Sequence, residues 1–486
     1  MNFKLYILSL FVFFFHLTNA QKLQPGFDKQ EYIDLMKLSA QIDDSAYRAA
    51  FPTSPRFHLS YRSPVMGLDN RWDLWTTGEG LGIISVRGTT KNAVSWLGNF
   101  YAAMVPAKGA LKLSDKETFT YELSSHPKAA VHVGWLLSTA YLAKDMLPKI
   151  DSCYKNGIKD IVIMGHSQGG AIVFLLTAYL YSLQLQGSLP ADIRFKTYCS
   201  AGPKPGNLYF AYEYERLTQG GWAYNVVNSA DWVPETPLSL QTVNDFNTVN
   251  PFANAKPFIK KQKGLKRWAL SYAYGRLDKP ARRAVKNYQK YLGTYVFKTV
   301  KKVLPEFSAP EYYNSNHYVR TGNTIVLLAD DAYFKLYPQN KDSIFINHFH
   351  APYLYLANKL PMHLPSHQNV ENNTALNGTW ELNYISGRKI AFNGLYPDKK
   401  PTISFDVTNN KFSGNTSCNS FTGILNTEHN QISFTNPFAL TKMMCPGEGE
   451  QSFIEVLKTV NAYTISGGNT LNFMMGDIAV MRFVRK

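Results

Sequence analysis

A short, glycine-flanked serine turn constrains the fold more than any other feature of this sequence. Asp160 to Met164 form an apolar β-run, and Gln168 to Leu183 have the composition of a helix. Between them, Gly165 to Gly169 read G-H-S-Q-G, which fits the G-x-S-x-G pattern with Ser167 at its centre. A tight strand–turn–helix connection of this kind exposes the serine oxygen above a sheet, beside a helix N-terminus that stabilises negative charge. The pattern therefore predicts a nucleophilic serine on an α/β sheet.

The segments around this turn support the same fold class. Over about the first 240 residues, helical and strand patterns alternate, which favours an α/β fold with a mostly parallel sheet. Helical periodicity occurs in Glu31 to Ile42 and Gly134 to Leu147, and the stretches typical of strands are Trp72 to Val86, Phe195 to Ala201 and Tyr224 to Asn228.

The C-terminal part of the chain has a different character. From Gly378 onward, short alternating runs such as Thr402 to Val407 are separated by Gly/Asn turns and interrupted by a helix-like stretch, Gln451 to Val460. Residues rich in Pro, His, Ser and Asn precede it, which is typical of a linker. We expect an α/β domain over 21–362, a linker over 363–374 and a mainly β domain over 375–486.

The N-terminus has the pattern of a signal peptide. Lys4 supplies a positive charge, Leu5 to Leu17 form an apolar core, and Ala20 is a small residue at the cleavage site. We therefore expect residues 1–20 to be removed and the protein to be exported to the periplasm, the cell surface or the medium. The chain has 4 cysteines and no Cys/His cluster with zinc spacing, so we expect no metal and no other cofactor.

The catalytic acid is expected just after a buried strand. A serine becomes a good nucleophile when a histidine takes its proton and a carboxylate orients that histidine. In one large class of serine hydrolases the residues follow in the order Ser, Asp or Glu, His. Asp231 comes soon after the β-run Tyr224 to Asn228, in N-S-A-D-W-V-P. We expect Asp231 to be the acid, with Glu235 as the second candidate.

The histidine is less constrained, because several lie downstream of Asp231. They are His317, His348, His350, His363 and His367. His348 and His350 stand at the start of an aromatic helical run that ends at Leu356. We expect His350 to be the base, and His348 is the alternative.

Residues 25–360 resemble the class 3 lipases, the fungal-lipase-like branch of the α/β-hydrolases. The matching pieces, in order along the chain, are Ser85 to Thr90, Val131 to Trp135, Gly202 to Asn207, Asp231 to Pro234 and His350 to Leu356. The resemblance implies an α/β-hydrolase fold and an oxyanion hole formed by Thr89 and Gln168. It also implies hydrolysis of lipid carboxylic esters through an acyl-enzyme, with Ser167, Asp231 and His350 as the triad.

The sequence departs from the family pattern at positions near the expected site. Phe349 stands where the family has an aspartate before its final histidine, while Asn347 keeps a polar neighbour before His348. Asn99 and Lys204 replace the usual Asp and Arg.

Alternative functions are a phospholipase at anionic membrane surfaces and a non-catalytic surface protein that binds lipid or a partner.

A lid is the next feature that the resemblance implies. Family members carry it between the positions of Asn99 and His132, and here that interval contains the apolar strip Phe100 to Pro106. This strip fits a lid that moves onto lipid, and it fits equally a fixed loop packed on the core above an esterase site.

The basic character of the chain comes from one segment, residues 251–302, which holds 15 Lys/Arg and one acidic residue, Asp278, for a net charge of +14. Within Pro280 to Leu304, apolar residues recur every three to four positions: Val285, Tyr288, Leu292, Val296, Val300 and Val303. The resulting basic amphipathic helix fits contact with an anionic membrane surface, or packing of its stripe on the domain with a solvated basic face. No recognised nucleic-acid-binding fold accompanies the charge, so we expect no nucleic-acid partner. The oligomeric state stays open.

Residues 376–486 resemble the META domain, as in the heat-shock protein HslJ. The matching pieces are Leu376 to Trp380, Gly414 to Gly423, Thr441 to Cys445 and Phe453. The resemblance implies a small mainly β (α+β) module with an accessory or binding role. Cys418 and Cys445 occupy the family's two cysteine positions, which implies that they pair in an oxidising compartment.

Overall fold

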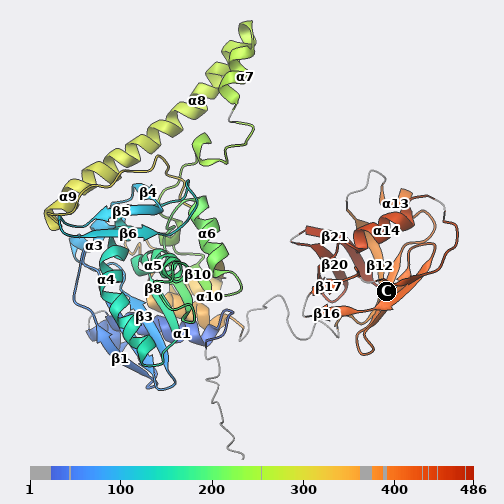
Figure 1. The fold of residues 1–486 in the computed structure, drawn as a ribbon, viewed down its shortest axis with the longest axis horizontal. Coiled ribbons are helices and arrows are strands. Elements are labelled where there is room, and N and C mark those ends of the chain that lie inside the picture. The colour runs from blue at the N-terminus through green and yellow to red at the C-terminus, as the bar shows by residue number, and fades with distance from the viewer. Residues whose placement is uncertain are drawn as a thin grey trace, which may run out of the picture. The chain divides into compact units, whose positions relative to one another are not determined.

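The computed structural model describes most of the chain, which divides into two compact units, Met1–Met362 and His363–Lys486. The described residues are 23–42, 45–252, 254–361, 375–386, 391–428, 431–435, 437–445, 447–476 and 478–486. The expected signal peptide and linker lie outside these residues. Figure 1 shows both units, and each is described on its own below.

The described residues of the first unit form a seven-stranded mixed sheet in the order β1-β2-β3-β8-β9-β10-β11 (Figure 1). The strands are β1 Phe57–Arg62, β2 Trp72–Thr77, β3 Leu81–Val86, β8 Asp160–His166, β9 Arg194–Ser200, β10 Ala223–Asn228 and β11 Asn323–Leu327. From β3 to β11 neighbouring strands are parallel, as expected. The pairs β1–β2 and β2–β3 are antiparallel and make the sheet mixed.

Helices pack around this sheet and bury its apolar strands. They are α1 Lys29–Ser39, η1 Ala40–Ile42, α2 Ser45–Ala49, α3 Ala93–Phe100, α4 Val133–Lys155, α5 Gln168–Leu185, α6 Leu208–Thr218, η2 Val233–Glu235, η3 Val243–Asp245, α10 Asp331–Leu336 and α11 His350–Lys359. Among the described helices, α5 alone is long and apolar enough to cross a membrane, but 78% of it is buried inside the protein. It is therefore the core helix behind the serine turn.

The region expected to hold a lid is built into the unit as small β-structures. β4 (Met104–Pro106) pairs with β7 (Ala130–His132), and β5 (Lys108–Lys112) forms a hairpin with β6 (Thr118–Glu122). In the apolar strip, Phe100 is 53% exposed, whereas Tyr101 to Val105 are buried. In this structure most of the strip is therefore packed on the body of the unit.

The basic insertion is helical over most of its length. Its elements are α7 Ala255–Lys261, α8 Gly264–Tyr288, the π-helical segment η4 Gln289–Tyr295 and α9 Val296–Val303. The helix expected over Pro280 to Leu304 is therefore present, but it begins earlier, at Gly264. Val285 and Val300 are buried, so the expected apolar stripe packs on the α/β body. The earlier part of α8 runs away from that body, with α7 at its far end (Figure 1).

The described residues of the second unit form a ten-stranded antiparallel sheet in the order β16-β17-β19-β20-β21-β12-β13-β14-β15-β18. Its elements are β12 Gly378–Ile385, α13 Phe392–Leu395, β13 Thr402–Asp406, β14 Lys411–Asn415, β15 Ser420–Ile424, β16 Asn426–Glu428, β17 Gln431–Ser433, β18 Ala439–Leu440, α14 Gly449–Leu457, β19 Ala462–Ser466, β20 Thr470–Met475 and β21 Ile478–Arg485. Trp380, Phe453 and Phe473 are fully buried in its core. Cys418 and Cys445 form the expected disulfide.

Candidate active site

The serine turn has the backbone that the sequence pattern predicts. Ser167 lies between β8 and α5 with φ 60° and ψ −128°, a conformation that side-chain-bearing residues adopt only when the surrounding structure enforces it. The flanking glycines allow this turn, because a Cβ on Gly165 would lie 2.3 Å from the backbone of Gly169. A Cβ on Gly169 would lie 2.3 Å from the carbonyl oxygen of Val86. The backbone N–H of Ser167 donates to the carbonyl of Ser200 at 2.9 Å, which ties the turn to β9.

The histidine in contact with the serine is His348. Its Nε2 lies 2.8 Å from the Ser167 hydroxyl and its Nδ1 lies 2.7 Å from Asp231 Oδ2. An ionised carboxylate can only accept, so Nδ1–H donates to Asp231 and Nε2 is left to accept from Ser167. These are the contacts that general-base activation of a serine requires.

His350, the expected base, is bonded elsewhere. It is the first residue of α11, and its Nε2 and Nδ1 each lie 2.8 Å from a hydroxyl, those of Ser39 and Tyr47. Both partners come from the N-terminal helices of the unit, so packing of α11 against this region directs the ring away from Ser167. The choice of His350 is therefore corrected to His348, the alternative.

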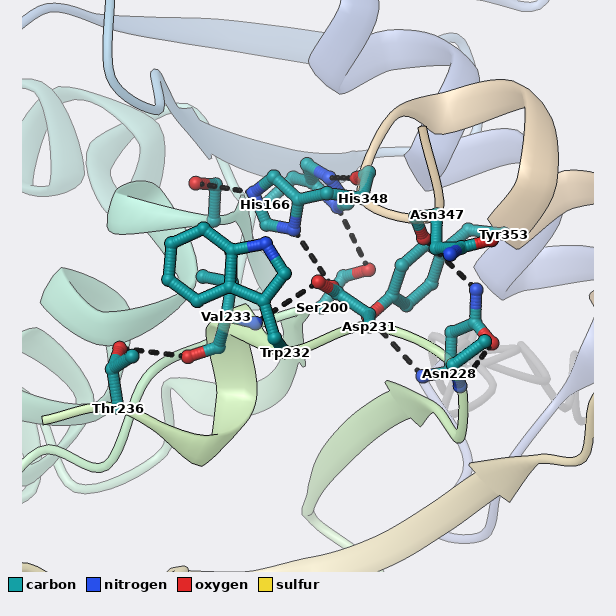
Figure 2. Close-up of polar contacts among 12 residues, drawn as sticks. His166, Ser200, Asn228, Asp231, Trp232, Val233, Thr236, Asn347, His348 and Tyr353 are labelled. Atoms are coloured by element: carbon teal, nitrogen blue, oxygen red, sulfur yellow. Dashed lines mark hydrogen bonds and ion pairs between the residues drawn. The ribbon is translucent and has the colours of Figure 1, made fainter. Parts of the chain in front are cut away.

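The carboxylate of Asp231 is buried and fully bonded (Figure 2). Besides His348, its Oδ2 accepts from the Tyr353 hydroxyl at 2.8 Å, and its Oδ1 accepts from the backbone N–H of Val233 at 3.0 Å. Burial and the neighbouring Asp231 raise the pKa of Tyr353 well above 10, so the phenol stays protonated as a donor. Glu235, the second candidate for the acid, lies in η2 and has no part in this network.

His166 supports the chain that carries His348 (Figure 2). Its Nε2–H donates to the His348 carbonyl at 2.7 Å, since a carbonyl can only accept. Its Nδ1 is then left to accept from the Ser200 hydroxyl at 3.1 Å, and Ser200 in turn lies 2.8 Å from the hydroxyl of Tyr32. The residue next to Ser167 thus positions the backbone of His348.

The two expected oxyanion-hole residues line the same cavity as Ser167. Gln168 is the first residue of α5, and backbone N–H groups in a first helical turn have no partner within the helix. Thr89 follows β3, and its hydroxyl oxygen accepts from Asn99 Nδ2 at 2.9 Å. Because that bond uses a lone pair, the Thr89 hydroxyl proton is free to point into the site.

Asn99, which stands where the family usually has an aspartate, is the residue that orients Thr89. Its Oδ1 lies 3.1 Å from Trp135 Nε1 and 3.0 Å from Gln168 Nε2. Both nitrogens are donors, so the amide oxygen must face them and the amide nitrogen must face Thr89. His132 Nε2–H donates to the backbone carbonyl of Asn99 at 3.2 Å, so the Val131 to Trp135 motif holds Asn99 in place.

The network opens into a cavity of about 1050 Å³. Ser167, His348 and Thr89 line it, and its apolar wall comes from Trp96, Phe100, Trp232, Val233, Leu238, Tyr288, Leu292, Phe345 and Phe349. Tyr288 and Leu292 belong to the basic insertion, which therefore covers part of the site. A volume this large, with few polar groups, suits a long apolar ligand.

Three buried histidines of this region predict a loss of stability in acid. Burial lowers the pKa of His132 and of His350 from 6.5 to about 3, and burial with repulsion from its histidine neighbours holds the pKa of His166 well below 6.5. Between about pH 3 and 6.5, the unfolded chain therefore binds protons at these positions that the native protein does not. Each such proton lowers the free energy of unfolding by about 1.4 kcal/mol per pH unit as the pH falls through this window.

We expect the urea midpoint of the first unit to be lower at about pH 5 than near pH 7.5. Tryptophan fluorescence reports mainly on this unit, because seven of the 8 tryptophans precede residue 362. The variant His350→Gln should show a shallower pH dependence, by the contribution of one proton. A midpoint that does not change over this range would contradict the prediction.

Comparisons with known proteins agree with both resemblances. The model of the lipase (class 3) family matches residues 83–241, and the model of the META domain matches residues 373–486. The chain thus has one region that matches the class 3 lipase family, followed by a second region that matches the META domain. No curated protein matches the sequence.

Several solved lipase structures are similar to part of the chain. The Rhizomucor miehei lipase propeptide complex is 20% identical, with a TM-score of 0.32, over 44% of this chain and 65% of that one. This chain thus spans a little under two thirds of that complex. Lipase II from Rhizopus niveus is 21% identical over 43% of this chain and 74% of its own, with a TM-score of 0.32. Lip2 lipase from Yarrowia lipolytica is 18% identical over 44% and 77%, with a TM-score of 0.33.

Proposed function

We propose that this protein is a serine hydrolase with an α/β-hydrolase fold that cleaves carboxylic ester bonds of lipids. The observation that carries the proposal is the chain of hydrogen bonds from Ser167 through His348 to Asp231, with Ser167 and His348 lining a large apolar cavity. The match of residues 83–241 to the class 3 lipase family supports the same reaction.

In the first half of the reaction, the Ser167 oxygen attacks the ester carbonyl while His348 Nε2 takes the hydroxyl proton. The carbonyl oxygen becomes an oxyanion and accepts from the backbone N–H groups of Thr89 and Gln168 and from the Thr89 hydroxyl. His348 then protonates the leaving alcohol as the carbon–oxygen bond breaks, which leaves the acyl group on Ser167. Asp231 stabilises the imidazolium that exists between these two proton transfers.

In the second half, water attacks the acyl-enzyme and His348 takes its proton. The second tetrahedral intermediate uses the same oxyanion donors, and its collapse returns the proton to Ser167 and releases the acid. The residues thus suffice for ester hydrolysis with water as the only co-reactant.

The cavity wall supports lipid esters over small polar ones. The fully packed strip Tyr101 to Val105 cannot swing out without exposing buried apolar side chains. Phe100, Tyr288 and Leu292 also line the cavity, so an acyl chain would lie between α3 and the basic insertion.

A fluorophosphonate probe tests the proposal directly. It should label the full-length protein at Ser167, as located by peptide mass spectrometry, and Ser167→Ala should stay unlabelled. In an assay with p-nitrophenyl esters from acetate to palmitate, the protein should also hydrolyse the long-chain esters. A protein that is neither labelled nor active on any ester would instead be a non-catalytic binder of lipid or a partner. The same spectra give the N-terminus, which we expect at Gln21 after export.

A further inference from the structure

We propose that the basic arm of the insertion, defined here as residues 254–284, docks the protein on an anionic lipid surface through one face of α8. The face consists of Leu265, Trp268 and Tyr272, which are 79%, 65% and 54% exposed. Spacings of three and four residues put the three side chains on the same side of the helix. Trp268 and Tyr272 stack with their ring centroids 5.7 Å apart, so the face is preformed.

This apolar face of the arm is not buried against the described residues of its own unit. None of the described residues of the arm is buried as a whole residue, although the side chain of Asp278 is only 7% exposed, and the first buried residue along α8 is Val285. From there the insertion is docked, since Gln289 Nε2 donates to the Tyr313 carbonyl at 2.8 Å and Val300 is fully buried. The expected amphipathic stripe is therefore buried against the body, whereas the separate face of Leu265, Trp268 and Tyr272 stays exposed within the described part of the unit.

The charge of the arm identifies the kind of surface it fits. Residues 254–284 hold ten Lys/Arg and a single acidic residue, Asp278, which pairs with Arg282. Cations also flank the apolar face itself, and the guanidinium of Arg276 lies 5.1 Å from the Tyr272 ring centroid. A helix with Trp, Tyr and Leu on one side and Lys/Arg around it is typical of binding in the headgroup layer of anionic bilayers.

Lipid fits this face better than a nucleic acid does. Phosphates of either partner would satisfy the cations, but only the acyl layer would take up Leu265 together with the two rings. The location adds an argument that rests on the proposed function: α8 continues directly into Tyr288, which lines the active-site cavity. An arm held on lipid would thus keep the cavity next to its substrate.

Vesicle flotation with the full-length Ser167→Ala variant tests the proposal without hydrolysis of the vesicles. Binding should be at least about tenfold stronger to phosphatidylcholine vesicles that contain about one-third phosphatidylglycerol than to pure phosphatidylcholine, and should weaken with salt. The double substitution Leu265→Ala/Trp268→Ala should lower the partition coefficient on the anionic vesicles about tenfold or more.

A matched control comes from the same helix. Leu277 is 78% exposed and lies about 120° around α8 from Leu265, so Leu277→Ala should change binding less than about twofold. Equal losses for the two faces, or equal binding to neutral and anionic vesicles, would overturn the proposal. So would tighter binding of single-stranded DNA that is unaffected by Leu265→Ala/Trp268→Ala. Because the assay uses an inactive variant and the fluorophosphonate assay uses no lipid, each proposal can fail without the other.

Discussion

Substitution of His348 by glutamine is expected to lower kcat/KM for ester hydrolysis by at least about 10⁴-fold, because the base that activates Ser167 is lost. Glutamine approximates the length of histidine and can still bond to Asp231, but it cannot accept a proton from Ser167 at neutral pH. The measurement is steady-state hydrolysis of a p-nitrophenyl ester at saturating and limiting substrate. Fluorophosphonate labelling of Ser167 should slow in parallel, since it depends on the same proton transfer.

His350→Gln is the matched control, two residues along the chain. His350 contacts Ser39 and Tyr47 rather than Ser167, so this variant should keep kcat/KM within about tenfold of the wild type while it loses some stability. If His350→Gln were inactive and properly folded by circular dichroism, and His348→Gln were active, the assignment of the base from the structure would be wrong.

The hydroxyl of Thr89 carries the second large effect. Thr89→Val keeps the shape of the side chain and its backbone N–H but removes the hydroxyl donor, and we expect kcat to fall by about 10²–10³-fold. KM should change little, because the donor acts on charge that develops in the transition state. The contact from Asn99 leaves the hydroxyl proton free for that charge.

Thr89→Ser serves as the control, because serine retains the hydroxyl within reach of Asn99. It should keep kcat within about tenfold of the wild type. A Thr89→Val variant as active as the wild type would mean that the two backbone N–H groups alone hold the oxyanion. Equal losses in both variants would point to a packing defect instead.

The parts of the site that could be predicted are those specified by neighbours along the chain. The serine turn needs glycines at positions 165 and 169 because backbones pass within contact distance there, and this requirement is visible in five consecutive residues. Asp231 is predictable in the same way, since it follows a β-run at the end of the strand where such acids lie.

The identity of the base could not be predicted with the same reliability. His348 and His350 are two residues apart with similar neighbours, so no local pattern separates them. Their contacts separate them. His350 contacts Ser39, which is 311 residues away, and His348 contacts Ser167, which is 181 residues away. The role of Asn99 could not be predicted for the same reason. It depends on Trp135 and Gln168, which donate to the amide oxygen of Asn99 and so leave its amide nitrogen facing Thr89.

The basic insertion shows the same division. Periodicity along the chain predicts a charged amphipathic helix, and α8, η4 and α9 confirm it. Periodicity cannot say which face meets the protein body, since the apolar residues of both halves of the helix have helical spacing. Packing on the body takes up Val285 and Val300 and leaves Trp268 exposed.

Local sequence thus specifies the α/β class, the nucleophile turn, the acid and the separate C-terminal β unit, because each depends on residues close together in the chain. The base, the orientation of the oxyanion donor and the free face of the arm arise only on folding. They depend on which side chains from distant parts of the chain come into contact. Only that packing decides which groups at these residues donate or accept hydrogen bonds and which are buried.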